Sequence, residues 1–254
     1  MESCKKPDFI IIGAQKCGTS TMFHHLRKHP DIFLPHKKEL HFFDENYEKG
    51  MDFYLQFFNR KNMQDQPFCT GEASPFYFFH PLAASRIYQH FPDIKLILLL
   101  RNPINRAYSN YQHQHRKGRI SISFEHAIKL EPEILEHKRK AYFEQENHSD
   151  LMYRRFSFLA RSLYSEQLPA WYQHFSKEQI LILKSEDYFK NPTDTFKQVF
   201  EFLGVKPFEI ILTKEHKKSD YPPMKPETRQ QLKEYFEPFN QQLYQLTGRD
   251  FGWK

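Results

Sequence analysis

The sequence predicts an α/β fold, in which a P-loop-type parallel β-sheet is flanked by helices. Residues 9–12 and 95–100 form continuous apolar runs, which are typical of strands covered on both faces. The first run leads into a glycine-containing turn and a hydroxyl-rich helix start, FIIIGAQKCGTST. Strand-like and helix-like segments then alternate along the chain, as the crossovers of a parallel sheet require.

Local patterns predict the elements of the first half of the chain. Hydroxyl side chains cap helices at their start, and proline favours the first turn of a helix and disfavours its continuation. In chain order we expect a strand at 9–12, a helix from Thr19 or Ser20 to about Lys28, a short strand at IFLP, a short amphipathic helix at 51–58, a strand and turn in FCTGEASP, and a helix from Pro81 to His90.

The second half continues the alternation. We expect a strand at 95–100, a helix from about Ile104 to Lys117, helices around 124–131 and 156–175, a strand at 179–183, and helices at 192–203 and 226–246. The segment from 204 to 226 is rich in proline and lysine and follows no regular period. Because long irregular connections in compact domains are often functional, it is a candidate ligand flap.

Length and charge narrow the class of protein. The chain has 254 residues and no shift in composition, which predicts a single domain over residues 1–254. Its net charge of +6 suits an anionic ligand but is modest for a nucleic-acid binder, so no nucleic-acid partner is expected. Composition indicates no oligomeric state.

The cysteines and the apolar segments indicate in which compartment of the cell the protein is expected. Cys4, Cys17 and Cys69 are odd in number and form no CxxC pair, so neither a disulfide framework nor a zinc site is indicated. No apolar run approaches the roughly 20 residues that a membrane span needs, and the N-terminus lacks an apolar signal core. We therefore expect a soluble cytoplasmic protein with no membrane partner.

The glycine-containing turn is the strongest functional signal. The backbone N–H groups of residues 17–21 would converge on an anion, and Lys16 adds positive charge. A Walker A loop would place lysine directly after the second glycine, whereas Gly18 is followed by Thr19. The turn therefore predicts a phosphate loop of another kind; a plain strand-turn-helix connection is the alternative.

A second anion site is suggested after the strand at 95–100. Arg101 leaves this strand and offers a planar donor fork, and Ser109 lies about two turns into the following helix. A P-loop kinase would commonly place a Mg²⁺-binding aspartate near such a strand end. Arginine there favours a second phosphate and no metal, although a solvated charge or a salt bridge is the alternative.

The segment KKELHFFDENYEKGMDFY contains candidate general bases. Glu39 and His41 lie beside an apolar phenylalanine pair, and burial can raise the pKa of a carboxyl toward neutrality. On composition alone, a solvated surface charge run explains the segment equally well.

A series of short segments spans almost the whole chain: QKCGTST, KELHFF, KGMDFYLQFF, GEASPFYF, RNPINRAYSNYQH, RSLYSEQL and LKEYFEPFNQQLYQLTGRDFGW. Together, in this order, they resemble the sulfotransferases that use 3′-phosphoadenosine-5′-phosphosulfate, most nearly the heparan-sulfate N- and 3-O-sulfotransferase branch. The resemblance implies a sulfotransferase fold and sulfuryl transfer to a carbohydrate or small-molecule acceptor, with adenosine 3′,5′-bisphosphate as a product.

The resemblance also implies site residues. The 5′-phosphosulfate loop would comprise Lys16, Cys17, Gly18, Thr19, Ser20 and Thr21, with Lys16 neutralising charge on the bridging oxygen. Arg101 and Ser109 match the pair that holds the 3′-phosphate, and Lys217 and Lys218 fall where the family has a basic loop. The catalytic residues would be Lys16, Glu39 as general base, and the neighbouring His41; the acceptor side would include Lys38, Glu72 and Ser74.

Two departures from the family pattern stand out. Where the heparan-sulfate enzymes read Glu-Lys, this chain reads Glu72-Ala73, so an assisting lysine is absent and heparan-type substrate handling is in doubt. The late cysteine pair and the membrane anchor are also missing, which points to a soluble bacterial-type relative. The rival interpretations are a nucleotide or small-molecule kinase on the same scaffold, and a non-catalytic binder of sulfated or nucleotide ligands.

Overall fold

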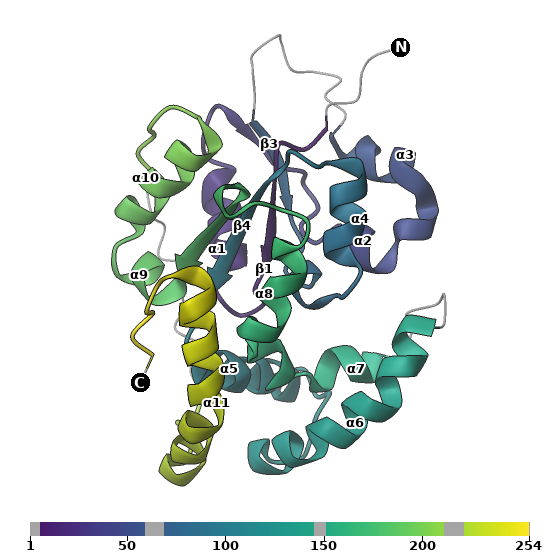
Figure 1. Cartoon of the computed structure of the whole chain (residues 1–254), viewed down its shortest axis with the longest axis vertical. Coiled ribbons are helices and arrows are strands. Elements are labelled where there is room, and N and C mark those ends of the chain that lie inside the picture. Colours follow the sequence, from purple (N-terminus) through teal and green to yellow (C-terminus); the bar gives the residue numbers. More distant parts are fainter. Residues whose placement is uncertain (1–5, 59–68, 145–150, 211–220, 254) are drawn as a thin grey trace. The chain divides into compact units, whose positions relative to one another are not determined.

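The computed structural model describes residues 6–58, 69–144, 151–210 and 221–253, shown in colour in Figure 1. The chain divides into two compact units. Unit 1 comprises Met1–Leu100 and Pro169–Lys217, and unit 2 comprises Arg101–Leu168 and Lys218–Lys254. The expectation that they form a single domain stays a prediction.

Unit 1 is built on a five-stranded parallel sheet with the order β2-β3-β1-β4-β5. Its strands are β1 (Phe9–Gly13), β2 (Ile32–Phe33), β3 (Cys69–Ala73), β4 (Lys95–Leu100) and β5 (Ile180–Lys184). Ile10 pairs with Glu72 on one side and with Leu96 on the other. Since the strands are parallel, their carboxyl ends meet at one edge of the sheet. The predicted α/β class and parallel sheet are confirmed.

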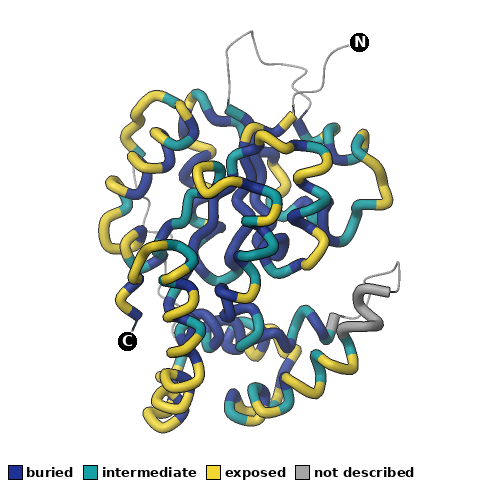
Figure 2. Tube along the Cα trace, viewed as in Figure 1, coloured by how far each residue is buried: buried dark blue, intermediate teal, exposed yellow. Residues whose placement is uncertain are grey.

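Helices flank this sheet. They are α1 (Thr19–Leu26), α2 (Phe42–Glu45), α3 (Gly50–Leu55), α4 (Ala83–His90), α9 (Ser185–Lys190) and α10 (Pro192–Leu203). In Figure 1, α2, α3 and α4 lie to the right of the strands, and α9 and α10 lie to the left. Every residue of β1 is buried, and β3 and β4 are buried beyond their first residue; these central strands are dark blue in Figure 2. Their continuous apolar runs are explained by this cover on both faces.

Unit 2 is helical. It contains α5 (Pro103–Arg116), α6 (Phe124–Glu144), α7 (Leu151–Phe156) and α11 (Pro226–Thr247), and α8 (Tyr164–Tyr172) starts in it and runs on into unit 1. An apolar cluster that includes Ile104, Tyr111, Phe124 and Phe236 forms its core. Among the helices that the structure describes, none combines the length and the apolar character that spanning a bilayer requires.

Two predicted helices are wrong in extent. The helix expected at 156–175 is replaced by the end of α7, an irregular segment, a 3₁₀ turn at Ala160–Ser162, and α8. The helix expected at 124–131 runs to Glu144, through Pro132. Three short helices, α2, α7 and α9, were not predicted. The remaining predicted strands and helices are found within about three residues of their expected ends.

Candidate active site

The loop between β1 and α1 has the backbone geometry of an anion cradle. Gly18 caps α1 in the left-handed conformation, with φ 99°. This positive φ favours glycine, and a Cβ atom at this position would also make a tight contact of 3.0 Å with the Phe189 ring. The cap contributes no side-chain acceptor, and the first turn of α1 carries no acidic residue. The positive end of α1 is therefore suited to an external anion such as phosphate.

Two further features shape this loop. Lys16 is half-buried and itself left-handed, with φ 73°. Ser185, buried directly after β5, donates its hydroxyl to the carbonyl oxygen of Cys17 at 2.9 Å. The residue that follows β5 thus holds this loop in position through a hydrogen bond. Sequence reasoning missed Ser185, because no local pattern links it to a loop 168 residues away.

The turn that contains Glu39 and His41 is bound to the end of β3. The N–H of Glu39 donates to the carbonyl oxygen of Ala73 at 3.0 Å, and the N–H of His41 donates to Ser74 Oγ at 3.2 Å. Both Glu39 and His41 have positive φ, 62° and 52°. Because β3 and β1 are neighbours in a parallel sheet, this turn and the Lys16 loop stand at the same edge.

The side chains of this turn form a chain of charged contacts. Lys38 Nζ lies 2.5 Å from Glu39 Oε1, and His41 Nε2 lies 3.4 Å from Glu39 Oε2. On its other side, His41 Nδ1 lies 2.7 Å from Asp44 Oδ2, and Asp44 is fully buried. Since a carboxylate can only accept, Nδ1 donates to Asp44 and the imidazole is held with Nε2 toward Glu39. Asp44 was also missed, although its position three residues after His41 is the spacing of one helical turn.

The contacts of Glu39 determine its charge. Partial burial alone would raise the pKa of this carboxyl, but the hydrogen bond from His41 and the charge and hydrogen bond of Lys38 lower it to about 2. Glu39 is therefore ionised at neutral pH. The alternative interpretation of this segment as a solvated charge run does not fit, because Lys38 and His41 are largely buried.

The other residues expected on the acceptor side are closed off from solvent. Glu72 is 1% exposed and Ser74 is fully buried, and Ser74 Oγ donates to Glu72 Oε2 at 2.8 Å. Burial raises the pKa of Glu72 to about 7, against the opposing hydrogen bonds from Ser74 and Tyr77. The expected contact of Lys38, Glu72 and Ser74 with an acceptor stays a prediction.

Unit 2 contains the residues expected to hold a second phosphate. Arg101 is half-buried, and its carbonyl oxygen accepts from the Tyr164 hydroxyl at 2.9 Å. The following Asn102 caps α5 by accepting from the N–H groups of Ile104 and Asn105. Ser109 is buried on α5. Lys217 and Lys218 lie outside the described residues.

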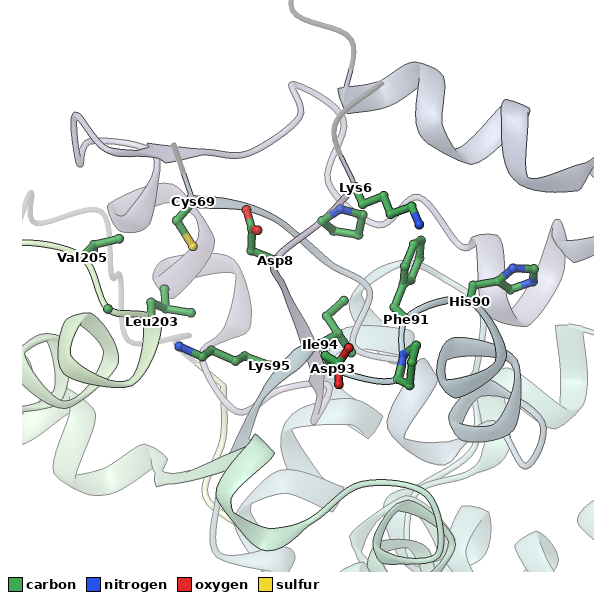
Figure 3. Close-up of a pocket in the computed structure, with 13 residues that line it drawn as sticks. Lys6, Asp8, Cys69, His90, Phe91, Asp93, Ile94, Lys95, Leu203 and Val205 are labelled. Atoms are coloured by element: carbon green, nitrogen blue, oxygen red, sulfur yellow. The ribbon is translucent and has the colours of Figure 1, made fainter. Parts of the chain in front are cut away.

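A pocket of about 540 Å³ lies at the opposite edge of the sheet (Figure 3). It is lined at the amino ends of β1, β3 and β4 by residues that include Asp8, Cys69 and Lys95. None of the predicted site residues lines it. Over the described ranges, no group of three or more histidine, cysteine, aspartate or glutamate residues is arranged to hold a metal ion.

Comparison with known proteins gives consistent matches. The family model for the sulfotransferase domain matches residues 6–248. Heparan sulfate glucosamine 3-O-sulfotransferase 3A1 of Mus musculus is 31% identical over 97% of this chain and 64% of its own length. The membrane-associated sulfotransferase kil1 of Dictyostelium discoideum is 29% identical over 98% of this chain and 66% of its own length. The chain thus spans just under two thirds of these curated relatives.

Solved structures agree with the family match. A sulfotransferase from Alicyclobacillus acidocaldarius superposes with a TM-score of 0.80 at 31% identity, covering 97% of this chain and 98% of that one. Mouse sulfotransferase SULT7A1, solved in complex with PAP, has a TM-score of 0.50 at 15% identity, covering 81% of this chain and 61% of its own. The second match shows likeness of fold alone.

Proposed function

This chain belongs to the sulfotransferase family, and we propose that it transfers a sulfuryl group from 3′-phosphoadenosine-5′-phosphosulfate to a hydroxyl or amine acceptor. The observation that carries the proposal is the position of the Glu39 turn. A carboxylate flanked by Lys38 and His41 stands at the same sheet edge as a loop suited to phosphate. A base and an anion cradle at the carboxyl edge of a parallel sheet suit group transfer from a phosphate ester.

The donor would be held at its two phosphate ends. Lys16 and the loop residues Cys17, Gly18, Thr19, Ser20 and Thr21 would bind the 5′-phosphosulfate. The left-handed Gly18 at the start of α1, with no side-chain cap and no acidic residue in the first turn, supports this assignment. We assign the 3′-phosphate to Arg101 and Ser109, and a supporting role to Lys217 and Lys218, on the family resemblance.

Each residue then has a defined task in an in-line displacement. The bound donor supplies the sulfuryl group, and the adenosine bisphosphate is the leaving group. Glu39 takes the proton that the acceptor loses as its new bond to sulfur forms. Lys16 and the loop N–H groups stabilise the negative charge that remains on the departing phosphate oxygen. His41, held by Asp44, keeps the Glu39 carboxylate in place. We propose no metal, because arginine rather than aspartate follows β4.

The proposal also covers the acceptor and the cellular location. We propose a carbohydrate or small-molecule acceptor that binds beside Lys38. The cysteines that the structure describes, Cys17 and Cys69, are free thiols, which suits a reducing compartment such as the cytoplasm.

Calorimetry tests the two-ended donor site. Adenosine 3′,5′-bisphosphate should bind far more tightly than 5′-AMP, since a charge-assisted phosphate site contributes on the order of 2 kcal/mol or more. Arg101→Gln should reduce this difference. Equal affinities for the two nucleotides in the unaltered protein would refute the assignment of Arg101 and Ser109.

Turnover tests the reaction itself. With labelled sulfuryl donor and a panel of sugars, phenols and amines, label should pass to at least one class of acceptor, and EDTA should leave the rate unchanged. Phosphoryl transfer from ATP with Mg²⁺ would instead establish the kinase alternative. Tight bisphosphate binding without transfer to any acceptor would favour the non-catalytic binder.

A further inference from the structure

The buried carboxylate of Glu72 has no task in the mechanism above, yet it lies directly behind the Glu39 turn. It sits near the carboxyl end of β3, opposite Ile10 of β1. Ser74 Oγ donates to Glu72 Oε2 at 2.8 Å. The buried hydroxyls of Ser74 and Tyr77 both contact the backbone that follows Glu39.

These two hydroxyls receive three successive backbone N–H groups. His41 N–H donates to Ser74 Oγ at 3.2 Å, while Phe42 N–H and Phe43 N–H donate to the Tyr77 hydroxyl at 2.9 and 3.4 Å. A hydroxyl has one proton and two lone pairs. When its proton points to Glu72, its lone pairs are left for the backbone. Glu72 thus sets the direction in which the Ser74 hydroxyl accepts from His41.

Without these hydrogen bonds, the backbone of residues 39–41 would relax to a more favourable conformation. Glu39 and His41 are both left-handed, a conformation that is unfavourable for residues with a side chain and persists only where the surroundings impose it. Ala73 holds the first of these residues through its carbonyl oxygen, and Ser74 holds the second through its hydroxyl. Both contacts come from the two residues that follow Glu72.

We propose that Glu72 is a positioning residue for sulfuryl transfer, because it orients the Ser74 hydroxyl so that this hydroxyl holds His41 in the strained Glu39–His41 turn. The inference rests on the proposed function of Glu39.

Variants of Ser74 and Glu72 test the proposal. Ser74→Ala removes the acceptor of the His41 N–H, and Glu72→Leu removes the acceptor that orients the Ser74 hydroxyl. Tyr111→Phe is the matched control, since the buried Tyr111 hydroxyl donates to the carbonyl oxygen of Ile122 at 2.8 Å in unit 2. Turnover should be expressed per bisphosphate-binding site counted by calorimetry, because a variant that only misfolds loses sites and turnover together.

We expect Ser74→Ala and Glu72→Leu to keep bisphosphate affinity and to lose roughly tenfold or more in turnover per site, as misplacement of a reacting group does. Tyr111→Phe should lower only the unfolding temperature. A second readout is the Glu39 carboxyl titration by carbon NMR. In Ser74→Ala the pKa of Glu39 should rise from about 2 toward 4.5, because the relaxed turn no longer keeps Glu39 in contact with His41 and Lys38.

The two readouts separate this inference from the proposed function. If the unaltered protein transfers no sulfuryl group, the function fails, and the NMR titration still decides whether Ser74, the partner of Glu72, positions Glu39. If the unaltered protein is active, unchanged turnover per site in Ser74→Ala or in Glu72→Leu overturns the inference and leaves the function standing. An unshifted Glu39 titration in Ser74→Ala also overturns it.

Discussion

At the scale of single residues, Lys38 has a large effect on the charge of Glu39. Its ammonium lies 2.5 Å from the carboxylate and is one of the causes that lower the pKa of Glu39 to about 2. A base with so low a pKa holds a proton weakly. An acceptor that displaces Lys38 from Glu39 would therefore also make Glu39 more basic at the moment when it takes the proton.

Lys38→Met should raise the pKa of Glu39 toward its ordinary value of 4.5, because the opposing charge is removed. The variant should consequently lose turnover as pH falls from 6 to about 4, a range in which the unaltered enzyme retains ionised Glu39. Lys37→Met is the control, since the Lys37 ammonium lies over the Phe57 ring, 5.8 Å from its centroid. Identical pH profiles for the Lys38 and Lys37 variants would show that Lys38 does not set the charge of Glu39.

At the scale of elements, the phosphate loop depends on support from β5 and α9. Ser185 begins α9, and its hydroxyl holds the Cys17 carbonyl at 2.9 Å. Because the N–H groups of several loop residues are proposed to bind one anion, a small change in loop conformation affects several bonds at once. Donor affinity should therefore respond to a residue that does not contact the donor.

Ser185→Ala should weaken adenosine bisphosphate binding about fivefold, which corresponds to the loss of one hydrogen bond of about 1 kcal/mol. Turnover at saturating donor should change much less. Ser85→Ala is the control, because the Ser85 hydroxyl makes a similar bond to the Leu82 carbonyl oxygen on α4. Calorimetry measures both, and an equal loss of affinity in the two variants would contradict the assigned role of Ser185.

The strands and most helices could be predicted because their signals are local: apolar runs for strands, and hydroxyl, proline and glycine positions for helix ends. The helix predicted at 156–175 failed for a non-local reason. Arg106 of α5 donates to the Phe158 carbonyl oxygen at 2.8 Å, and Glu131 of α6 accepts from the N–H groups of Leu159 and Ala160, both at 2.8 Å. Distant side chains thus satisfy backbone groups that helical hydrogen bonds would otherwise use.

The residues of the candidate site could also be predicted only in part. The Lys16 loop followed from its own pattern, and Glu39 and His41 followed mainly from the family resemblance. The supporting contacts of Ser185 and Tyr164 could not be inferred, because each joins segments that are far apart in sequence. Glu72 was expected on the acceptor side; it is buried in the structure, and its contact with an acceptor stays a prediction.

At the scale of the whole molecule, each unit contains, among its described residues, one buried glutamate whose burial disfavours the ionised form. Burial raises the pKa to about 7 for Glu72 in unit 1 and for Glu131 in unit 2. In an unfolded chain both would titrate near 4.5. Between these values the folded protein binds more protons than the unfolded chain, so stability falls as pH rises.

The free energy of unfolding should therefore decrease from pH 5 to pH 7.5, by an amount on the order of a few kcal/mol. Urea denaturation at the two pH values measures the difference. Glu72→Gln and Glu131→Gln should each make it smaller, whatever their effect on stability at one pH. Glu201→Gln, on the exposed side of α10, should leave it unchanged. A difference unaffected by either buried substitution would contradict the raised pKa values.

The central claim, that Glu39 is the base in sulfuryl transfer, is tested most directly by turnover of Glu39→Gln with labelled donor, alongside calorimetry of the bisphosphate. Glutamine keeps the size of the side chain but cannot take a proton. Turnover should fall by roughly 10² or more while bisphosphate affinity barely changes, and His41→Gln should be milder. Nearly normal turnover in Glu39→Gln, with His41→Gln inactive, would contradict the account and assign the base to His41.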